Sequence, residues 1–372
     1  MTLTIAIRGA GAAGLSLAQA LLHQLPGVAI SVFDQRERLP HPQRTFCFFA
    51  DSTAICPVPP ACRWNEVVLS GPDFHRTLDC HETPYSLTRG QDFFSTLLHN
   101  LESRGVRFHW GCPEVAIHPG EVRSGGISRR FDYVIDAAFR PAGQSAILWQ
   151  SFAGIWVKST KAIFNPEQAL LMDLQGCDPA TPLRFAYLLP TSPYTALVEH
   201  TVFSPQPQPR AWHLEGCREW LARRGFEALE EVDSEYGAIP LGLKTNTPTN
   251  SVLQVGSVGG AVRASTGYAF QTIQHQVAAL AGQIANASLT APRIQPSRPF
   301  PAWLRLADRL FLEALARAPA RGTMMMQQLL RQAPERELLR FLSGHVTLWE
   351  ALRVMVNVPK VAMIRSLCVG DS

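Results

Sequence analysis

The sequence lacks the features that mark membrane-spanning, metal-binding and nucleic-acid-binding proteins. No apolar stretch reaches the roughly 20 residues that cross a bilayer. The eight cysteines are scattered, with no Cys-x-x-Cys pair and no Cys/His cluster at zinc-ligand spacing. The net charge is only +4, and no long run of Lys or Arg occurs. We therefore expect no transmembrane helix, no metal site and no nucleic-acid partner.

A secretion signal is also missing, because Thr2–Arg8 leads straight into a glycine motif rather than through a charged and then apolar leader. This feature and the scattered cysteines predict a cytoplasmic protein with free, buried thiols. The mild positive charge leaves attachment to the inner face of a membrane open. The sequence carries no signal of oligomeric state.

The N-terminal residues instead have the pattern of a βαβ unit. Thr2–Arg8 and Val28–Phe33 are β-rich runs, and Leu15–Gln24 between them has the apolar spacing of a helix. The turn Gly9–Gly14 reads Gly-x-Gly-x-x-Gly, and Asp34 follows the second run. This order of strand, glycine turn, helix, strand and acid predicts a Rossmann-type dinucleotide-binding unit.

The glycines and the acid of this unit have separate expected roles. Gly9 permits the tight turn, Gly11 lets a pyrophosphate approach the backbone, and Gly14 lets the helix pack on the strand. The N-terminus of the helix faces the phosphates. Asp34 is expected to accept hydrogen bonds from the adenosine ribose.

A second glycine-rich segment favours FAD over NAD as the bound dinucleotide. It follows a buried-type strand at Ser251–Gly256 and precedes a helix at Tyr268–Ile284, where the chain of a two-domain flavoprotein returns to its cofactor. Ser257 stands where many such proteins carry an aspartate. The cofactor-binding candidates in this segment are Gly256, Gly259, Gly260, Thr266 and Gly267.

The remaining chain divides into regions of strand and helix pattern. Its 372 residues, 46% of them hydrophobic, suffice for two domains that share a ligand cleft. Loops are expected over 36–63, strands at 184–189 and 195–203, and a helix at 211–224. We predict an α/β fold with a Rossmann-type FAD-binding domain, an inserted β-rich substrate domain and a helical C-terminal tail. The expected boundaries are 1–148 (FAD-binding, first part), 149–245 (substrate), 246–295 (FAD-binding, return segment) and 296–372 (helical tail).

The tail has apolar residues at helical spacing beside several arginines over 300–342. Such a pattern suits an interfacial helix on anionic lipid. It equally suits an amphipathic helix packed on its own domain, which we favour.

Two of the predicted strands carry the candidate chemistry. The second presents Glu199 beside His200, and a pleated strand directs neighbouring side chains to opposite faces. One of the two should face the interior, where an apolar cavity raises the pKa of a carboxylic acid and lets it donate a proton at neutral pH. The alternatives are an ion pair of Glu199 with Arg184 and a His200 exposed at the surface.

Eight segments, running in order from beyond the glycine turn into the tail, match one known family. They are Thr45–Phe49, Phe152–Trp156, Leu171–Asp173, Arg184–Pro190, Leu197–Thr201, Glu235–Pro240, Ser265–Tyr268 and Arg340–Gly344. In these segments the chain resembles the FAD-dependent lycopene cyclases of the bacterial type. His200 departs from the family pattern, because members commonly have a second acid there.

The resemblance implies a redox-neutral flavoenzyme that protonates the terminal double bond of a linear carotenoid or other polyprenoid. Ring closure gives a tertiary carbocation that then loses a proton, and reduced FAD is thought to stabilise the cation by its charge. NADPH is the implied electron source. Glu199 is the implied proton donor, with Asp173 and Glu235 as supporting polar residues. His200 is either the base for the final proton or, as we favour, a surface residue.

Two other functions stay open at this point. An FAD-dependent monooxygenase or halogenase could share the scaffold, although no second dinucleotide fingerprint for NAD(P)H is obvious in the sequence. The third hypothesis is a non-catalytic relative that binds an isoprenoid or a flavin. His200 and Ser257, both departures from the family pattern, keep this hypothesis open.

Overall fold

The computed structural model describes residues 2–38, 44–50, 56–112, 114–139, 146–176, 181–243, 252–290, 294 and 298–356. The expected boundaries at 245/246 and 295/296, the end of the tail over 357–372, and Cys177 and Cys368 lie outside the described residues. The cysteines inside them are free thiols, and Cys80 and Cys217 are fully buried.

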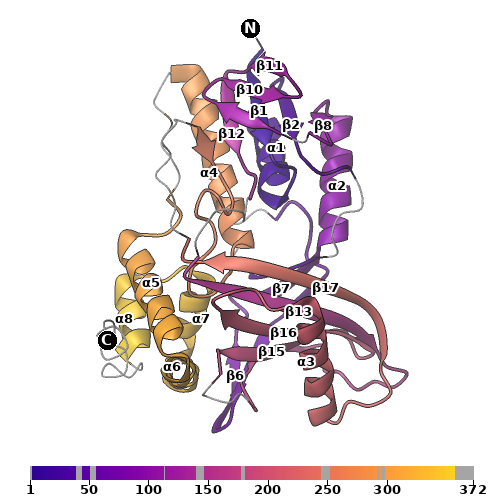
Figure 1. The fold of residues 1–372 in the computed structure, drawn as a ribbon, viewed down its shortest axis with the longest axis vertical. Coiled ribbons are helices and arrows are strands. Elements are labelled where there is room, and N and C mark those ends of the chain that lie inside the picture. Colours follow the sequence, from indigo (N-terminus) through magenta and orange to yellow (C-terminus); the bar gives the residue numbers. More distant parts are fainter. Residues whose placement is uncertain are drawn as a thin grey trace.

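The first layer is a Rossmann-type unit, drawn at the top of Figure 1. Its five strands are all parallel and lie in the order β18-β12-β1-β2-β8. Helices α1, α2 and α4 bury their apolar faces with these strands in one hydrophobic cluster. The bounds are β1 (Thr4–Arg8), α1 (Ala12–Gln24), β2 (Ala29–Phe33), α2 (Gly90–Ser103), β8 (Arg107–His109), β12 (Tyr133–Asp136), β18 (Leu253–Gln254) and α4 (Phe270–Thr290).

The second layer is a seven-stranded sheet in the order β17-β13-β16-β15-β14-β5-β6. Neighbouring strands in this sheet run antiparallel, except that β14 and β5 are parallel. Strands β5 and β6 come from the first part of the chain, so residues 66–79 extend a sheet that is otherwise built from 148–241. The bounds are β5 (Glu66–Gly71), β6 (Phe74–Asp79), β13 (Leu148–Lys158), β14 (Gln168–Asp173), β15 (Arg184–Ser192), β16 (Thr195–Ser204) and β17 (Glu230–Leu241).

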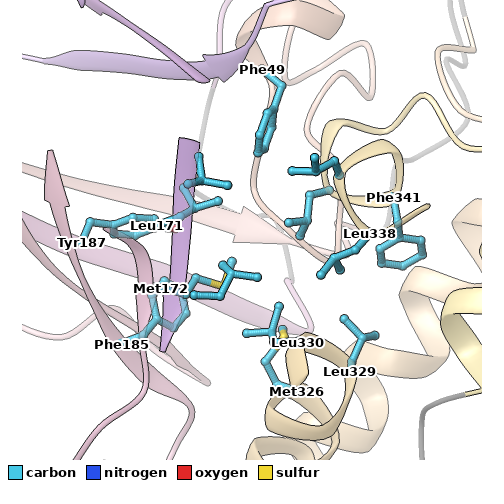
Figure 2. Packing of buried hydrophobic residues seen from close by; sticks show 14 of the residues in the cluster. Phe49, Leu171, Met172, Phe185, Tyr187, Met326, Leu329, Leu330, Leu338 and Phe341 are labelled. Atoms are coloured by element: carbon cyan, nitrogen blue, oxygen red, sulfur yellow. The ribbon is translucent and has the colours of Figure 1, made fainter. Parts of the chain in front are cut away.

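Helices cover both faces of this sheet. Helix α3 (Arg210–Arg223) packs on one face through Cys217, Trp220 and Leu221. On the other face the C-terminal helices form the largest core with side chains of β14 and β15, as Figure 2 shows for Leu171, Phe185, Met326, Leu330 and Leu338. These helices are α5 (Ala302–Arg317), α6 (Pro319–Gln332), α7 (Glu335–Ser343) and α8 (Leu348–Val356).

The α/β class, the Rossmann-type unit and the helical C-terminal region are confirmed, and the tail packs on its own fold. Within the part of the chain that the structure describes, no helix is both long and apolar enough to cross a bilayer.

Small sheets complete the fold and correct one expectation. Strand β3 (Thr45–Phe49) and the start of β4 (Cys62–Trp64) fall in 36–63, where we expected loops, and both strands pair with β7 (Tyr85–Arg89). Phe46 and Phe48 of β3 stack on Phe270 of α4 with ring centroids 4.8 and 4.7 Å apart. This contact with a helix more than 200 residues away gives β3 a partner that local sequence does not reveal. A three-stranded sheet contains β9 (Ala116–His118), β10 (Glu121–Ser124) and β11 (Ile127–Arg130).

Candidate functional site

One cavity of about 600 Å³ joins the Rossmann-type unit to the seven-stranded sheet. Gly9, Gly11 and Asp34 line it on the side of the unit. Glu199 and Glu235 line it on the side of the sheet. The glycine motif and the candidate acid, far apart in the sequence, therefore face the same cavity.

The glycine turn is packed too tightly for side chains at two of its three glycines. Gly9 has a φ of +102°, and a β-carbon there would lie 2.9 Å from the α-carbon of Ala138. A β-carbon on Gly14 would lie 1.9 Å from the carbonyl oxygen of Gly9. At Gly11 the same construction meets nothing within 4 Å, and the residue lines the cavity. A ligand can therefore approach the backbone at Gly11.

Asp34 is held as a carboxylate at the end of β2. The Ala10 N–H donates to its Oδ2 at 2.6 Å, and the backbone N–H and Nε of Arg36 donate to its Oδ1 at 2.8 and 2.9 Å. Burial alone would raise the pKa of Asp34, but these hydrogen bonds and the Arg36 charge lower it below the ordinary value. The sequence pointed to the acid but not to Arg36, which lines the cavity beside it.

The return segment divides into residues that line the cavity and residues that shape the turn. Thr266 and Gly267 line it, as does Ser257. Gly256, Gly259 and Gly260 do not; a β-carbon on Gly256 would lie 2.6 Å from that of Ala13, and one on Gly259 would lie 2.7 Å from the oxygen of Gln254. Gly256 and Gly259 therefore permit close packing, with Gly256 bringing the segment against α1, whereas Gly260 has open space and a φ of +76°.

Gln150 of β13 adds an unsatisfied polar atom to the same wall. Its Oε1 is buried, and it has no hydrogen-bond partner among the described residues. Gln150 lines the cavity directly beside Gly267, where a β-carbon would lie 1.9 Å from that oxygen. A buried acceptor of this kind is normally satisfied by a bound molecule or water.

The two carboxylates converge over a glycine in the middle of the sheet. Glu199 of β16 and Glu235 of β17 both pair with Gly154 of β13 from opposite sides, so all three lie on one face. A β-carbon on Gly154 would lie 3.0 Å from the γ-carbon of Glu199 and 3.4 Å from that of Glu235. The missing side chain at 154 thus leaves room for both carboxylates at one place.

Burial keeps Glu199 in its acid form. It raises the pKa of Glu199, the negative charge of Glu235 raises it further, and the result is about 8. Burial also raises the pKa of Glu235. The Thr45 hydroxyl donates to Oε2 of Glu235 at 2.5 Å, and this hydrogen bond partly offsets that rise. At neutral pH the pair therefore holds a proton.

Neutral polar groups surround this pair. Burial raises the pKa of Tyr85, Tyr187, Tyr268 and Cys47, so none of them carries charge at neutral pH. The hydroxyl of Tyr268 donates to that of Tyr85 at 3.4 Å. The sequence did not single out the tyrosines as site residues, because they come from β7, β15 and the return segment and meet only in the fold.

The sequence profile of a family described as "Lycopene cyclase protein" matches residues 4–368 of this chain, nearly its whole length. The chain belongs to the lycopene cyclase family. It matches none of the curated proteins with which it was compared.

Solved structures share the fold of this lycopene cyclase family member at low identity. A geranylgeranyl bacteriochlorophyll reductase-like protein from Thermoplasma acidophilum is 14% identical with a TM-score of 0.61, over 99% of both chains. A flavin-dependent brominase is 14% identical with a TM-score of 0.57, over 94% of this chain and 97% of its own. The protein CtdE, solved with FAD and a substrate, is 13% identical with a TM-score of 0.57, over 98% and 100%.

His200 lies on the other face of the sheet of this family member and is buried there. Its Nδ1 is 3.2 Å from Nδ1 of His213 in α3, and His213 Nε2 is 3.0 Å from the Ser151 hydroxyl. Burial and the neighbouring His213 lower the pKa of His200 to about 3, and burial lowers that of His213 to about 4. The expectation of a surface His200 is therefore wrong, and the residue does not face the cavity.

Arg184 lines a small cavity beside His200, under α3. It therefore lies on the face of the sheet opposite Glu199, and the ion pair that the sequence left as an alternative does not form. Glu199 faces the large cavity, as the acid hypothesis requires.

Asp173 lies outside the large cavity. The register of β14 shifts between Leu170 and Asp173, which turns Asp173 away from the face that simple alternation predicts. Its Oδ2 accepts hydrogen bonds from Trp220 Nε1 at 2.8 Å and from the Arg224 guanidinium. Asp173 thus anchors α3, whereas Glu235 is the supporting acid that reaches the cavity.

Proposed function

We propose that this protein is an FAD-dependent, redox-neutral cyclase that closes a ring at the end group of lycopene or a related linear polyprenoid. The observation that carries the proposal is Glu199, a carboxylic acid that converges with Glu235 on the wall of a cavity that begins at the glycine turn. Membership of the lycopene cyclase family supports the reaction class. The flavoprotein-type fold supports FAD as the dinucleotide.

The residues of the cavity fit FAD. Gly11 offers open backbone, Asp34 is an ionised acceptor beside the turn, and Gln150 has a buried oxygen without a partner. Thr266 and Gly267, which come from the return segment of the chain, also line the cavity. Bound in its reduced form, with NADPH as the proposed electron source, FAD would supply negative charge near a developing carbocation.

Glu199 is the proton donor in this reaction. It transfers its proton to the terminal double bond, and the resulting cation is attacked by the next double bond to close the ring. The cost of the transfer is lowered because ionised Glu199 then sits close to the positive charge that it has created. Phe152 and Tyr187 line the same wall, and aromatic faces attract cations.

Apart from Glu235, the groups nearest the donor are neutral, and the sheet behind them is covered by helices. The tyrosines and Cys47 are neutral, and the C-terminal helices close the face of the sheet beyond Tyr187. A cation in such surroundings meets few nucleophiles that would end the reaction early. The substrate class, a linear polyene, fits a wall built largely from apolar and aromatic side chains.

A monooxygenase or halogenase is the second candidate, because a brominase shares the fold. The two are separated by incubating the purified protein with lycopene in lipid vesicles, FAD and NADPH, with and without oxygen. We expect a cyclised product of unchanged mass without oxygen and without stoichiometric NADPH consumption. A gain in mass that requires oxygen, with no isomer formed anaerobically, would establish the second candidate. Substrate binding without any product would establish a non-catalytic relative.

A further inference from the structure

The position of His200 leaves the final proton of the reaction without an assigned acceptor. A cyclase must remove a proton from the ring to form the new double bond. His200 packs under α3, on the face of the sheet away from the cavity, and so cannot receive it. The acceptor must be a group on the cavity side of the sheet.

Glu235 is such a group and is joined to Glu199 by the architecture of the sheet. The two residues lie on the strands to either side of β13, opposite Gly154, and both γ-carbons lie within 3.4 Å of the place where its β-carbon would be. Two carboxylates this near to each other in a buried site cannot both be ionised at low cost. They therefore share one proton.

The surroundings decide which carboxylate carries that proton. The Thr45 hydroxyl donates to Oε2 of Glu235 at 2.5 Å, which stabilises an ionised carboxylate. Glu199 instead lies opposite the neutral phenol of Tyr187 across the β15–β16 pairing. The pair is thus asymmetric at rest, with the acid at Glu199 and the base at Glu235.

We propose that Glu235 is the general base that removes the ring proton, so that one proton circulates between the two glutamates; this rests on the proposed function. The Glu199 proton forms a C–H bond at the terminal alkene carbon, and ring closure forms a C–C bond and leaves a cation. A ring C–H bond then breaks, its electron pair forms the new double bond, and its proton passes to Glu235. Return of the proton from Glu235 to Glu199 restores the resting state without net gain of protons or electrons.

Titration of the pair depends on every ionisable group near it. These groups are Cys47, Tyr85, Tyr187, Tyr268, Cys217, Arg44 and Asp233. Apart from Arg44 and Asp233 they are neutral, so the pair itself should dominate the pH profile.

The test compares the proteins Glu235→Gln, Glu199→Gln and wild type, with Glu231→Gln as a control on the same strand. Glu231 is paired with Arg218 at the surface and lies outside the cavity lining. Glu199→Gln should form no ring. Glu235→Gln should turn over about 10²–10⁴-fold more slowly, the range for loss of a general base, and should release products with a displaced double bond or with added water. Glu231→Gln should match wild type.

A second readout does not depend on turnover. Infrared titration of the purified protein without substrate should show a protonated carboxyl band at neutral pH that Glu199→Gln removes. In Glu235→Gln the same band should titrate at lower pH, because the neighbouring negative charge is gone. If that variant fails to fold, Thr45→Val serves instead. Without the hydroxyl donor, the pKa of Glu235 should rise in the same infrared titration.

Wild-type product at wild-type rate from Glu235→Gln, with an unchanged Glu199 titration, would overturn the base assignment while leaving the cyclase intact. Absence of any cyclised product from the wild type would instead overturn the proposed function. The two failures are therefore distinguishable.

Discussion

Glu199 and His200 are neighbours in the chain, yet their side chains lie on opposite faces of the seven-stranded sheet. Glu199 faces the large cavity, and His200 packs against His213 and Trp212 of α3. Because the pleat of β16 fixes this arrangement, an acid at position 200 of this chain would also face α3.

Substitutions at Glu199 and His200 test their opposite orientations. Glu199→Gln should abolish cyclisation while FAD remains bound, and adding His200→Glu should not restore activity, because the new acid cannot reach the cavity. His200→Gln alone should keep the product unchanged. Product analysis of the three proteins by chromatography and mass tests this. Recovery of cyclisation in the double variant would contradict the assigned orientation of β16.

The buried histidines predict a loss of stability in acid. Unfolded His takes up a proton near pH 6.5, whereas folded His200 and His213 resist protonation down to about 3 and about 4. The free energy of unfolding should therefore fall as pH falls from about 6.5 to about 4, by up to about 1.4 kcal/mol for each pH unit and histidine.

Urea unfolding at about pH 7 and pH 5 measures this effect. His213→Gln should make stability less dependent on pH. Equal pH dependence in wild type and His213→Gln would show that the pair is not the cause.

Substitutions at Gly11 and Gly14 of the turn should have different effects. Gly14→Ala places a β-carbon 1.9 Å from the Gly9 oxygen and should lower both stability and FAD content. Gly11→Val extends into the cavity and should abolish FAD binding with little change in stability. Flavin absorbance and thermal unfolding of the purified proteins report the two effects. Gly282→Ala in α4, where a β-carbon meets only Gln24 at 3.4 Å, is the control. Normal flavin content in Gly11→Val would contradict the cofactor site.

A buried ion pair should hold the C-terminal helices to the rest of the fold. Arg263 of the return segment pairs with Asp308 of α5 at 3.3 Å, and its guanidinium lies 4.3 Å from the ring centroid of Phe341 in α7. Asp308→Ala leaves a buried cation and should cost about 3–5 kcal/mol in the free energy of unfolding. Arg309→Ala breaks an exposed pair in the same helix and should cost less than about 1 kcal/mol. Similar losses in urea unfolding for both would refute this role.

Local patterns sufficed to predict the elements whose residues interact with near neighbours in sequence. The expected second strand at 28–33 is β2 at Ala29–Phe33, and the strands expected at 184–189 and 195–203 are β15 and β16 with slightly different ends. Glycine spacing, alternation and helical periodicity are set within a few residues, so they can be read directly.

Features that depend on distant partners were not predictable in the same way. The register shift in β14 reverses the face of Asp173, and no local signal marks it. Glu235 reaches the cavity because β17 pairs with β13 opposite Gly154. The tyrosines near Glu199 meet through pairing and packing of strands from three parts of the chain. Position within a sheet, rather than residue type, decides which of these polar groups face the cavity.

The most direct test of the account is cyclisation in D₂O. In the first turnover after equilibration in D₂O, proton-initiated ring closure by Glu199 should place one deuterium in the new ring, because the donor has exchanged with solvent before it acts, and Glu199→Gln should form no labelled ring. The anaerobic reaction is run with wild type and variant side by side, and the product is analysed by mass. Cyclised product without deuterium, or labelled rings from Glu199→Gln at the wild-type rate, would contradict the assignment of Glu199 as the proton donor.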